Sequence, residues 1–208
     1  MFMDSNRNYL NPGMLWDNLT IVPAGCTNEL LHKIEKNDLR NFDVIIIHVG
    51  VNDIDNHDGK SVAKRLIDIT SRIKASAPGI HIILSEVTPR QLRKDNEVLI
   101  CNEELKVLQN TDNITLARHS NLRDSEWSYH KKKDDKHFTE EAIARLAGNL
   151  KDAFRRAIGA KRRMSAGRHN DNWSGYHGSR NGEGRNKDKQ SQLMNKRFSL
   201  KDLLKILR

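Results

Sequence analysis

Hydrophobic residues follow two patterns along this chain, and the two patterns alternate. The first is an apolar run without regular polar interruption, longest at Phe42–Val49, which contains Val44–Ile47 without a break. Shorter runs of the same kind are Ile21–Pro23, Ile80–Leu84 and Ile114–Ala117. Because β-branched residues without alternation are typical of strands buried on both faces, these runs predict strands of a parallel sheet. The longest run is expected at the centre of that sheet.

The second pattern repeats apolar residues every three or four positions and predicts helices between the strands. It is clearest at Ser61–Ala77, which ends before Pro78 and Gly79. Similar spacing predicts three further helices: one capped by Thr27 or Asn28, one at Asp95–Gln109, and one that runs through Phe154 with Thr139 as its cap. Strands that alternate with helices of crossover length indicate an α/β fold, whose parallel sheet is covered on both faces.

The chain begins with a very short apolar segment, Met1–Met3, ahead of the polar turn Asp4–Asn6. Turns rich in Asp, Ser and Asn normally follow a strand, so we expect a first strand that is truncated to three residues at most. Such a start is typical of a fragment, or of a gene product that has lost its first strand. A missing central strand would expose the edges of its neighbours and displace the residues of the turn.

Charge divides the chain into two unequal parts. The net charge is +9, yet residues 1–158 contain 23 basic and 23 acidic side chains, whereas residues 159–208 contain 13 and 4. We therefore expect a neutral folded domain at 1–158. Residues 159–197 are rich in Gly, Ser, Asn, Arg and Lys, which predicts a disordered basic linker. Helically spaced leucines that follow Ser199 predict a short amphipathic helix at 198–208.

Cysteine spacing and hydropathy bear on cofactors and location. The two cysteines, Cys26 and Cys101, belong to no spacing typical of a metal site. No apolar run is long enough to span a membrane, and the first residues lack the pattern of a signal peptide. We therefore expect an intracellular, cytoplasmic protein that uses no metal or other cofactor. The sequence predicts no oligomeric state.

Polar residues of catalytic type lie where the predicted strands end. In open α/β sheets, ligands bind outside the carboxyl ends of the strands. Ser5 follows the first strand, Gly25 lies between a strand and a helix, Asn52 follows the longest strand, and Asp134 and His137 precede the last helix. Taken singly, each has an ordinary interpretation as a turn residue, a capping residue or a solvated charge.

Taken together and in order, these groups resemble the four sequence blocks of the SGNH (GDSL-type) hydrolase family. The blocks here are Met3-Asp4-Ser5, Gly25, Gly50-Val51-Asn52-Asp53 and Asp134-Asp135-Lys136-His137. The resemblance covers residues 4 to roughly 156. It implies a three-layer α/β/α sandwich with a mainly parallel, flavodoxin-like sheet. It also implies the hydrolysis of small acyl, acetyl-like esters through an acyl-serine intermediate.

The same resemblance implies a role for each site residue. Ser5 would be the nucleophile, His137 the general base, and Asp134 the carboxylate that orients the histidine. The backbone N–H groups of Ser5 and Gly25, with the side chain of Asn52, would form the oxyanion hole. In this context, the polar residues after the longest strand are interpreted as loop-shaping residues and not as a metal cluster: Asp53, Asp55, His57 and Asp58.

Two departures from the family pattern support a second hypothesis. Met3 stands where the family has glycine, and the first strand is nearly absent. The chain would then be a non-catalytic SGNH-like interaction module. Its tail, residues 159–208, would bind nucleic acid, with Trp173 and Tyr176 stacking on unpaired bases. Esterase modules of this type are also similar to parts of proteins encoded by animal mobile elements. A tail that only aids solubility is the alternative interpretation.

Overall fold

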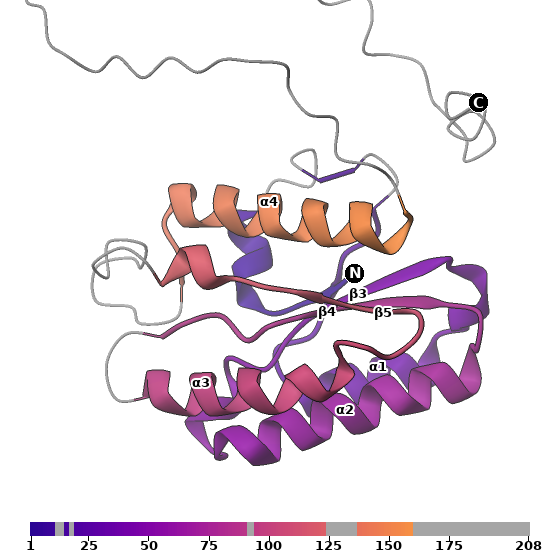
Figure 1. The fold of residues 1–208 in the computed structure, drawn as a ribbon, viewed down its shortest axis with the longest axis horizontal. Coiled ribbons are helices and arrows are strands. Elements are labelled where there is room, and N and C mark those ends of the chain that lie inside the picture. Colours follow the sequence, from indigo (N-terminus) through magenta and orange to yellow (C-terminus); the bar gives the residue numbers. More distant parts are fainter. Residues whose placement is uncertain (11–14, 17–18, 91–93, 124–136, 160–208) are drawn as a thin grey trace, which may run out of the picture. The chain divides into compact units, whose positions relative to one another are not determined.

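Figure 1 shows the computed structural model of the chain, which describes residues 1–10, 15–16, 19–90, 94–123 and 137–159. Within these residues, parallel strands form a five-stranded sheet in the order β2-β1-β3-β4-β5. The strands are β1 (Phe2–Met3), β2 (Val22–Pro23), β3 (Val44–His48), β4 (His81–Ser85) and β5 (Ile114–Ala117). The longest apolar run forms β3, which lies between β1 and β4 at the centre of the sheet, as expected.

Helices cover both faces of the sheet, so the three-layer α/β/α arrangement is confirmed (Figure 1). The helices α1 (Thr27–Lys36), α2 (Gly59–Ser76) and α3 (Asp95–Glu104) lie on one face, and α4 (Glu140–Ala157) lies on the other. Each face has its own cluster of buried apolar side chains. Short 3-10 helices complete the described elements: η1 (Ser5–Tyr9), η3 (Leu39–Asn41), η4 (Asp53–Asp55), η6 (Leu105–Leu108) and η7 (Ser120–Leu122).

The first strand is short, but it is present and paired on both sides. Phe2 lies opposite Val22 of β2 and Ile47 of β3, so β1 joins the two strands. Met3, which stands where the SGNH family has glycine, is fully buried in the apolar cluster beneath α4. The bulky side chain therefore fills the core. The first strand is truncated, as expected, but its two residues are enough to bridge the neighbouring strands, so their edges are not exposed there.

The start of α1 differs from the prediction. The residue that caps the helix is Cys26, not Thr27 or Asn28, and its side chain makes no capping hydrogen bond. The carboxylate of Asp53 supplies the cap, since it accepts from the backbone N–H of Thr27 at 3.0 Å and from the Thr27 hydroxyl at 2.5 Å. A negative charge at a helix N-terminus is favourable, and this one comes from the loop after β3.

The other aspartates after β3 also shape the chain. Asp55 pairs with Arg90, and Asp58 caps α2 by accepting from the backbone N–H of Ser61 at 2.8 Å. Gly50 turns the chain out of β3 with a φ of +130°, a conformation that side chains rarely adopt. These contacts agree with the loop-shaping interpretation.

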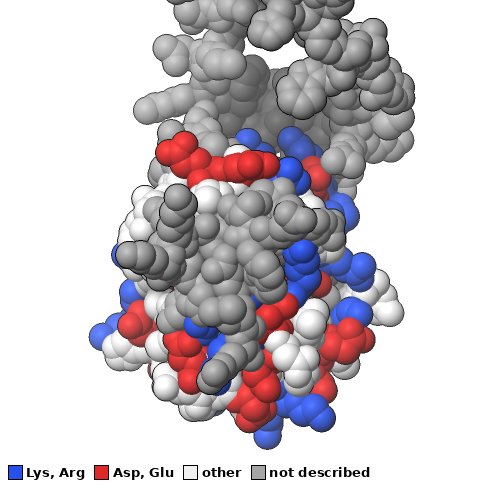
Figure 2. Space-filling model, turned by 90° about the vertical axis from the view of Figure 1, so that its left-hand side faces the viewer, with Lys and Arg blue, Asp and Glu red and all other residues white. Residues whose placement is uncertain are grey.

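Acidic and basic side chains are intermixed over the described part of the face shown in Figure 2. This agrees with the balanced charge of residues 1–158. In the described part of the chain, no helix has the length and apolarity needed to cross a membrane. Residues 160–208, with Trp173, Tyr176 and the predicted helix at 198–208, lie outside the described residues. The domain boundary, the disordered linker and the nucleic-acid contact therefore remain predictions.

Candidate active site

The structure brings Ser5 and His137 into direct contact, although 132 positions separate them in the sequence. The Ser5 hydroxyl oxygen lies 2.8 Å from Nε2 of His137. Both side chains are partly exposed, so a small molecule in solution can reach them. A serine hydroxyl hydrogen-bonded to an imidazole nitrogen is the arrangement that nucleophilic catalysis by serine requires.

Ser5 is held by the turn that follows β1. Asp4 is the N-cap of η1, and its carboxylate accepts from the backbone N–H of Asn6 at 2.9 Å. The backbone N–H of Asp4 donates to the carbonyl of His48 at 3.1 Å, which continues the pairing of β1 with β3. Ser5, the first residue of η1, is thus fixed to the sheet on one side and to a capped turn on the other.

His137 is held by its neighbours at the start of α4. Phe138 is fully buried, and its backbone N–H lies 3.4 Å from the side-chain oxygen of Asn6. The ring of Tyr9 meets the His137 imidazole edge to face, with centroids 5.7 Å apart. Both contacts come from η1, so the turn that carries the serine also positions the histidine. Asp134, the predicted orienting carboxylate, lies outside the described residues.

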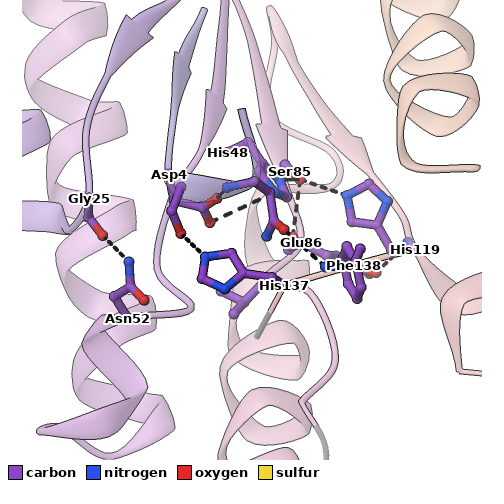
Figure 3. Close-up of polar contacts among 12 residues, drawn as sticks. Asp4, Gly25, His48, Asn52, Ser85, Glu86, His119, His137 and Phe138 are labelled. Carbon is purple, nitrogen blue, oxygen red and sulfur yellow. Dashed lines mark hydrogen bonds and ion pairs between the residues drawn. The ribbon is translucent and has the colours of Figure 1, made fainter. Parts of the chain in front are cut away.

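Asn52 and Gly25 form a second contact at the same end of the sheet. The Asn52 side-chain amide donates to the carbonyl oxygen of Gly25 at 2.8 Å. The backbone N–H of Ala24 donates to the carbonyl of Met3 at 2.9 Å, which places Gly25 beside the end of β1. Figure 3 shows the Asn52 side chain directed at Gly25. Gly25 and Asn52 are both partly exposed, as Ser5 and His137 are. The predicted site residues that the structure describes thus form two contacting pairs, Ser5 with His137 and Asn52 with Gly25.

The backbone N–H of Gly25, a predicted oxyanion donor, already has a partner. It donates to the carboxylate of Glu29 at 2.7 Å. Glu29 is exposed and lies in the first turn of α1, where an acidic side chain reaches back to cap the helix. Sequence analysis did not identify this residue, although an acid three positions after a helix cap is a recognisable pattern.

Sequence analysis also missed a buried polar chain beside Ser5. His48, Ser85 and His119 lie at the ends of β3 and β4 and after β5, and each is almost fully buried (Figure 3). The Ser85 hydroxyl oxygen is 2.6 Å from Nδ1 of His48 and 2.6 Å from Nε2 of His119. A histidine inside an otherwise apolar run was the available signal, because a buried imidazole needs hydrogen-bond partners.

Burial controls the charge of both imidazoles. It lowers the pKa of His48, and the nearby Asp4 carboxylate opposes this effect. It lowers the pKa of His119 well below its usual value, and the neighbouring His48 adds to the shift. Both rings are therefore neutral at neutral pH.

No protein-family model matches the sequence, and no curated protein matches it significantly. Several solved structures do match. A lipolytic protein of the G-D-S-L family from Veillonella parvula superimposes with a TM-score of 0.60 at 20% identity, over 74% of this chain and 96% of that one. A GDSL-like lipase from Bacteroides thetaiotaomicron superimposes with a TM-score of 0.58 at 16% identity, over 75% of this chain and 87% of that one. A carbohydrate esterase of family 3 from Talaromyces cellulolyticus superimposes with a TM-score of 0.58 at 14% identity, over 71% of this chain and 80% of that one.

These likenesses agree with the arrangement of the sheet and helices described above. Two of the matched structures carry GDSL-type names, and the sequence blocks resemble the same type of protein. The resemblance deduced from the sequence is thereby confirmed, and the chain has the fold of the SGNH (GDSL-type) hydrolases.

Proposed function

We propose that this protein is a serine hydrolase that cleaves carboxylic esters of small acyl groups, with Ser5 as its nucleophile. The observation that carries the proposal is the 2.8 Å contact between the Ser5 hydroxyl and Nε2 of His137. The hydrolase fold supports the reaction class. An acetyl esterase solved with acetate is among the structural neighbours, which supports the choice of a small acyl group.

Each partner has a defined part in the proposed reaction. Ser5 Oγ attacks the ester carbonyl carbon, and its proton passes to Nε2 of His137. The tetrahedral intermediate then collapses, and His137 returns the proton to the departing alcohol. A water molecule, deprotonated by the same nitrogen, attacks the acyl-serine and releases the acid. Asp134 would orient His137 during both steps.

Charge that develops on the carbonyl oxygen needs hydrogen-bond donors at the same place. We assign this role to the backbone N–H groups of Ser5 and Gly25 and to the side-chain amide of Asn52. Asn52 lies against Gly25 and is partly exposed, which supports the assignment. Because the Gly25 N–H is bonded to Glu29, this carboxylate must move aside before the oxygen can enter.

Hydrolysis of p-nitrophenyl acetate tests the proposal. The wild-type protein should release p-nitrophenol faster than Ser5→Ala and His137→Ala, both of which should fall close to the background rate. Ser71→Ala is a matched control, because this exposed serine bonds only within α2, to the carbonyl of Ile67. Equal rates for the wild type and Ser5→Ala would rule out the proposed function.

A further inference from the structure

The buried polar chain beside Ser5 continues through the protein in both directions. At one end, Nε2 of His48 faces the Asp4 carboxylate at 3.9 Å. At the other end, the side-chain amide of Asn149, on α4, lies 3.0 Å from Nδ1 of His119. Ser85 joins the two histidines, and Asp4 is next to the proposed nucleophile. The chain thus runs from α4 across β4 and β3 to the cap of the turn that carries Ser5.

The positions of the protons along this chain follow from its donors. The Asn149 amide nitrogen can only donate, so Nδ1 of His119 accepts and its single proton sits on Nε2. That proton is donated to the Ser85 oxygen over 2.6 Å. The Ser85 hydroxyl is then free to donate to Nδ1 of His48, also over 2.6 Å. His48 must therefore carry its proton on Nε2, the nitrogen that faces Asp4.

The alternative arrangement, with the His48 proton on Nδ1, is electrostatically less favourable. Ser85 Oγ also lies 3.1 Å from the carbonyl oxygen of Glu86, and it could donate there instead. His48 would then need its proton on Nδ1 to bond Ser85, and its bare Nε2 lone pair would face the Asp4 carboxylate. The Nε2 lone pair of His48 and the Asp4 carboxylate would repel each other in this buried site. The carboxylate therefore favours the arrangement in which the His48 proton is on Nε2.

Asp4 links this chain to the reacting serine. One carboxylate oxygen accepts from the backbone of Asn6 and caps η1, while the other faces His48. Apart from this facing carboxylate, Nε2 of His48 has no hydrogen-bond partner within the described residues. The donor is buried, and the Asp4 carboxylate oxygen that faces it at 3.9 Å is the acceptor toward which its proton points.

We propose that His48 is a positioning residue for Ser5. Its Nε2–H holds the carboxylate of Asp4, and Ser85, His119 and Asn149 hold His48 in the required tautomer. His48 does not touch a substrate; it acts through the cap of η1. The inference deepens the proposed function and rests on it for the role of Ser5, but the tautomer that it requires can be measured without any substrate.

Long-range proton–nitrogen correlation spectra of protein labelled with 15N-histidine provide that measurement. At pH 7.5, the rings of His48 and His119 should both be neutral and protonated on Nε2. The variants His48→Gln and His119→Gln assign the two signals by their loss. A proton on Nδ1 of His48 would overturn the proposal. The tautomer is read from the folded wild type, whose ring signals can also be assigned by triple-resonance experiments if a variant does not fold.

A pair of substitutions tests the effect on Ser5. The amide nitrogen of glutamine reaches about as far as Nε2 of histidine, whereas asparagine reaches only as far as Nδ1. We expect His48→Asn to lower kcat for p-nitrophenyl acetate about tenfold or more with KM little changed, because a misplaced nucleophile slows the chemical step. His48→Gln should recover most of that loss. His81→Asn is the control, since His81 lies at the opposite end of β4 and bonds Thr115.

The outcomes separate this inference from the proposed function. If Ser5→Ala is as active as the wild type, the proposed function fails. The tautomer of His48 still tests whether the hydrogen bonds from Asn149 to Asp4 run in the inferred direction. If the wild type is active and His48→Asn keeps full kcat, the positioning role is overturned. Equal losses in folded His48→Gln and His48→Asn would overturn it too. If both variants fail to fold, the spectrum of the wild type decides.

Discussion

The carboxylate of Glu29 accepts a 2.7 Å hydrogen bond from the backbone N–H of Gly25. This N–H is one of the donors that the proposed oxyanion hole needs. The ester carbonyl must compete with this side chain for the same hydrogen. Glu29 is exposed, so it can move away from Gly25, and under the proposed function its contact would weaken substrate binding modestly.

Under the proposed function, removing that carboxylate should therefore speed ester hydrolysis. An exposed hydrogen bond of this kind contributes roughly 0.5–1.5 kcal/mol, so Glu29→Ala should raise kcat/KM for p-nitrophenyl acetate by about two- to tenfold. Glu35→Ala is the control, since Glu35 is an exposed acid of the same helix that faces Arg72. If the two variants show the same kcat/KM as the wild type, Glu29 does not compete with the substrate.

Asn52→Ala should have the opposite effect on the same site. The loss of one oxyanion donor typically costs about 3–4 kcal/mol in the barrier, which lowers kcat about a hundredfold or more. Steady-state kinetics with p-nitrophenyl acetate measure the change. A fall confined to KM would mean that Asn52 binds the ester without stabilising the transition state. Asn37→Ala, in an exposed residue that follows α1, is the matched control and should leave kcat unchanged.

The buried histidines predict how stability depends on pH. Folding lowers the pKa of His48 and His119, so the unfolded chain binds more protons than the folded protein below the ordinary histidine pKa. Their contribution to the free energy of unfolding is complete above about pH 6.5 and is lost as the pH falls below it, by about 1.4 kcal/mol per pH unit for each ring. The groups facing them are Asp4, whose carboxylate moderates the effect at His48, and the two rings themselves.

Urea unfolding between pH 8 and pH 5 measures this dependence. The free energy of unfolding should decline below about pH 6.5, and the decline should be shallower in His119→Gln. The exposed aspartates with lowered pKa, Asp38 and Asp58, titrate at lower pH. The Met1 amine, whose pKa burial lowers to about 6, and His81, whose pKa burial also lowers, titrate within this range in the wild type and in His119→Gln alike, so the difference between the two proteins reports the buried ring. A flat profile for the wild type would show that neither ring is held neutral by burial.

Gly50 offers a test of the turn that presents Asn52. Its φ of +130° disfavours any side chain, and an added Cβ would lie 2.9 Å from a methyl carbon of Val87. Gly50→Ala should therefore lower the free energy of unfolding by about 1–3 kcal/mol. Gly79→Ala is the control, because nothing lies within 4 Å of its Cβ position. Comparable urea midpoints for the two variants would contradict the strain argument.

The spacing of apolar residues predicted most of the helices and strands correctly. β5 has the predicted bounds, and β3, β4, α2 and α4 differ from theirs by a few residues at most. Asp95–Gln109 was predicted as one helix, but α3 ends at Glu104 and the chain continues as the 3-10 turn η6. Apolar spacing does not distinguish these two windings, because both keep a residue and its third neighbour on one side.

Features that depend on distant partners could not be read from the sequence. Two residues would not form a strand by themselves, and β1 exists because β2 and β3 pair with it from both sides. The cap of α1 comes from Asp53, 26 positions away from Thr27. The contact of Ser5 with His137 was predicted through the family resemblance, whereas the links from His48 to Ser85 and His119 require the register of three strands.

The separation of Ser5 and His137 has a consequence for synthesis on the ribosome. Ser5 leaves the ribosome 132 positions before His137. β1 must also wait for β3 before it can pair on both sides. Contacts between such distant positions form slowly and late in folding. In a nascent chain, the contact between Ser5 and His137 therefore cannot form until His137 has been made and the start of α4 has docked.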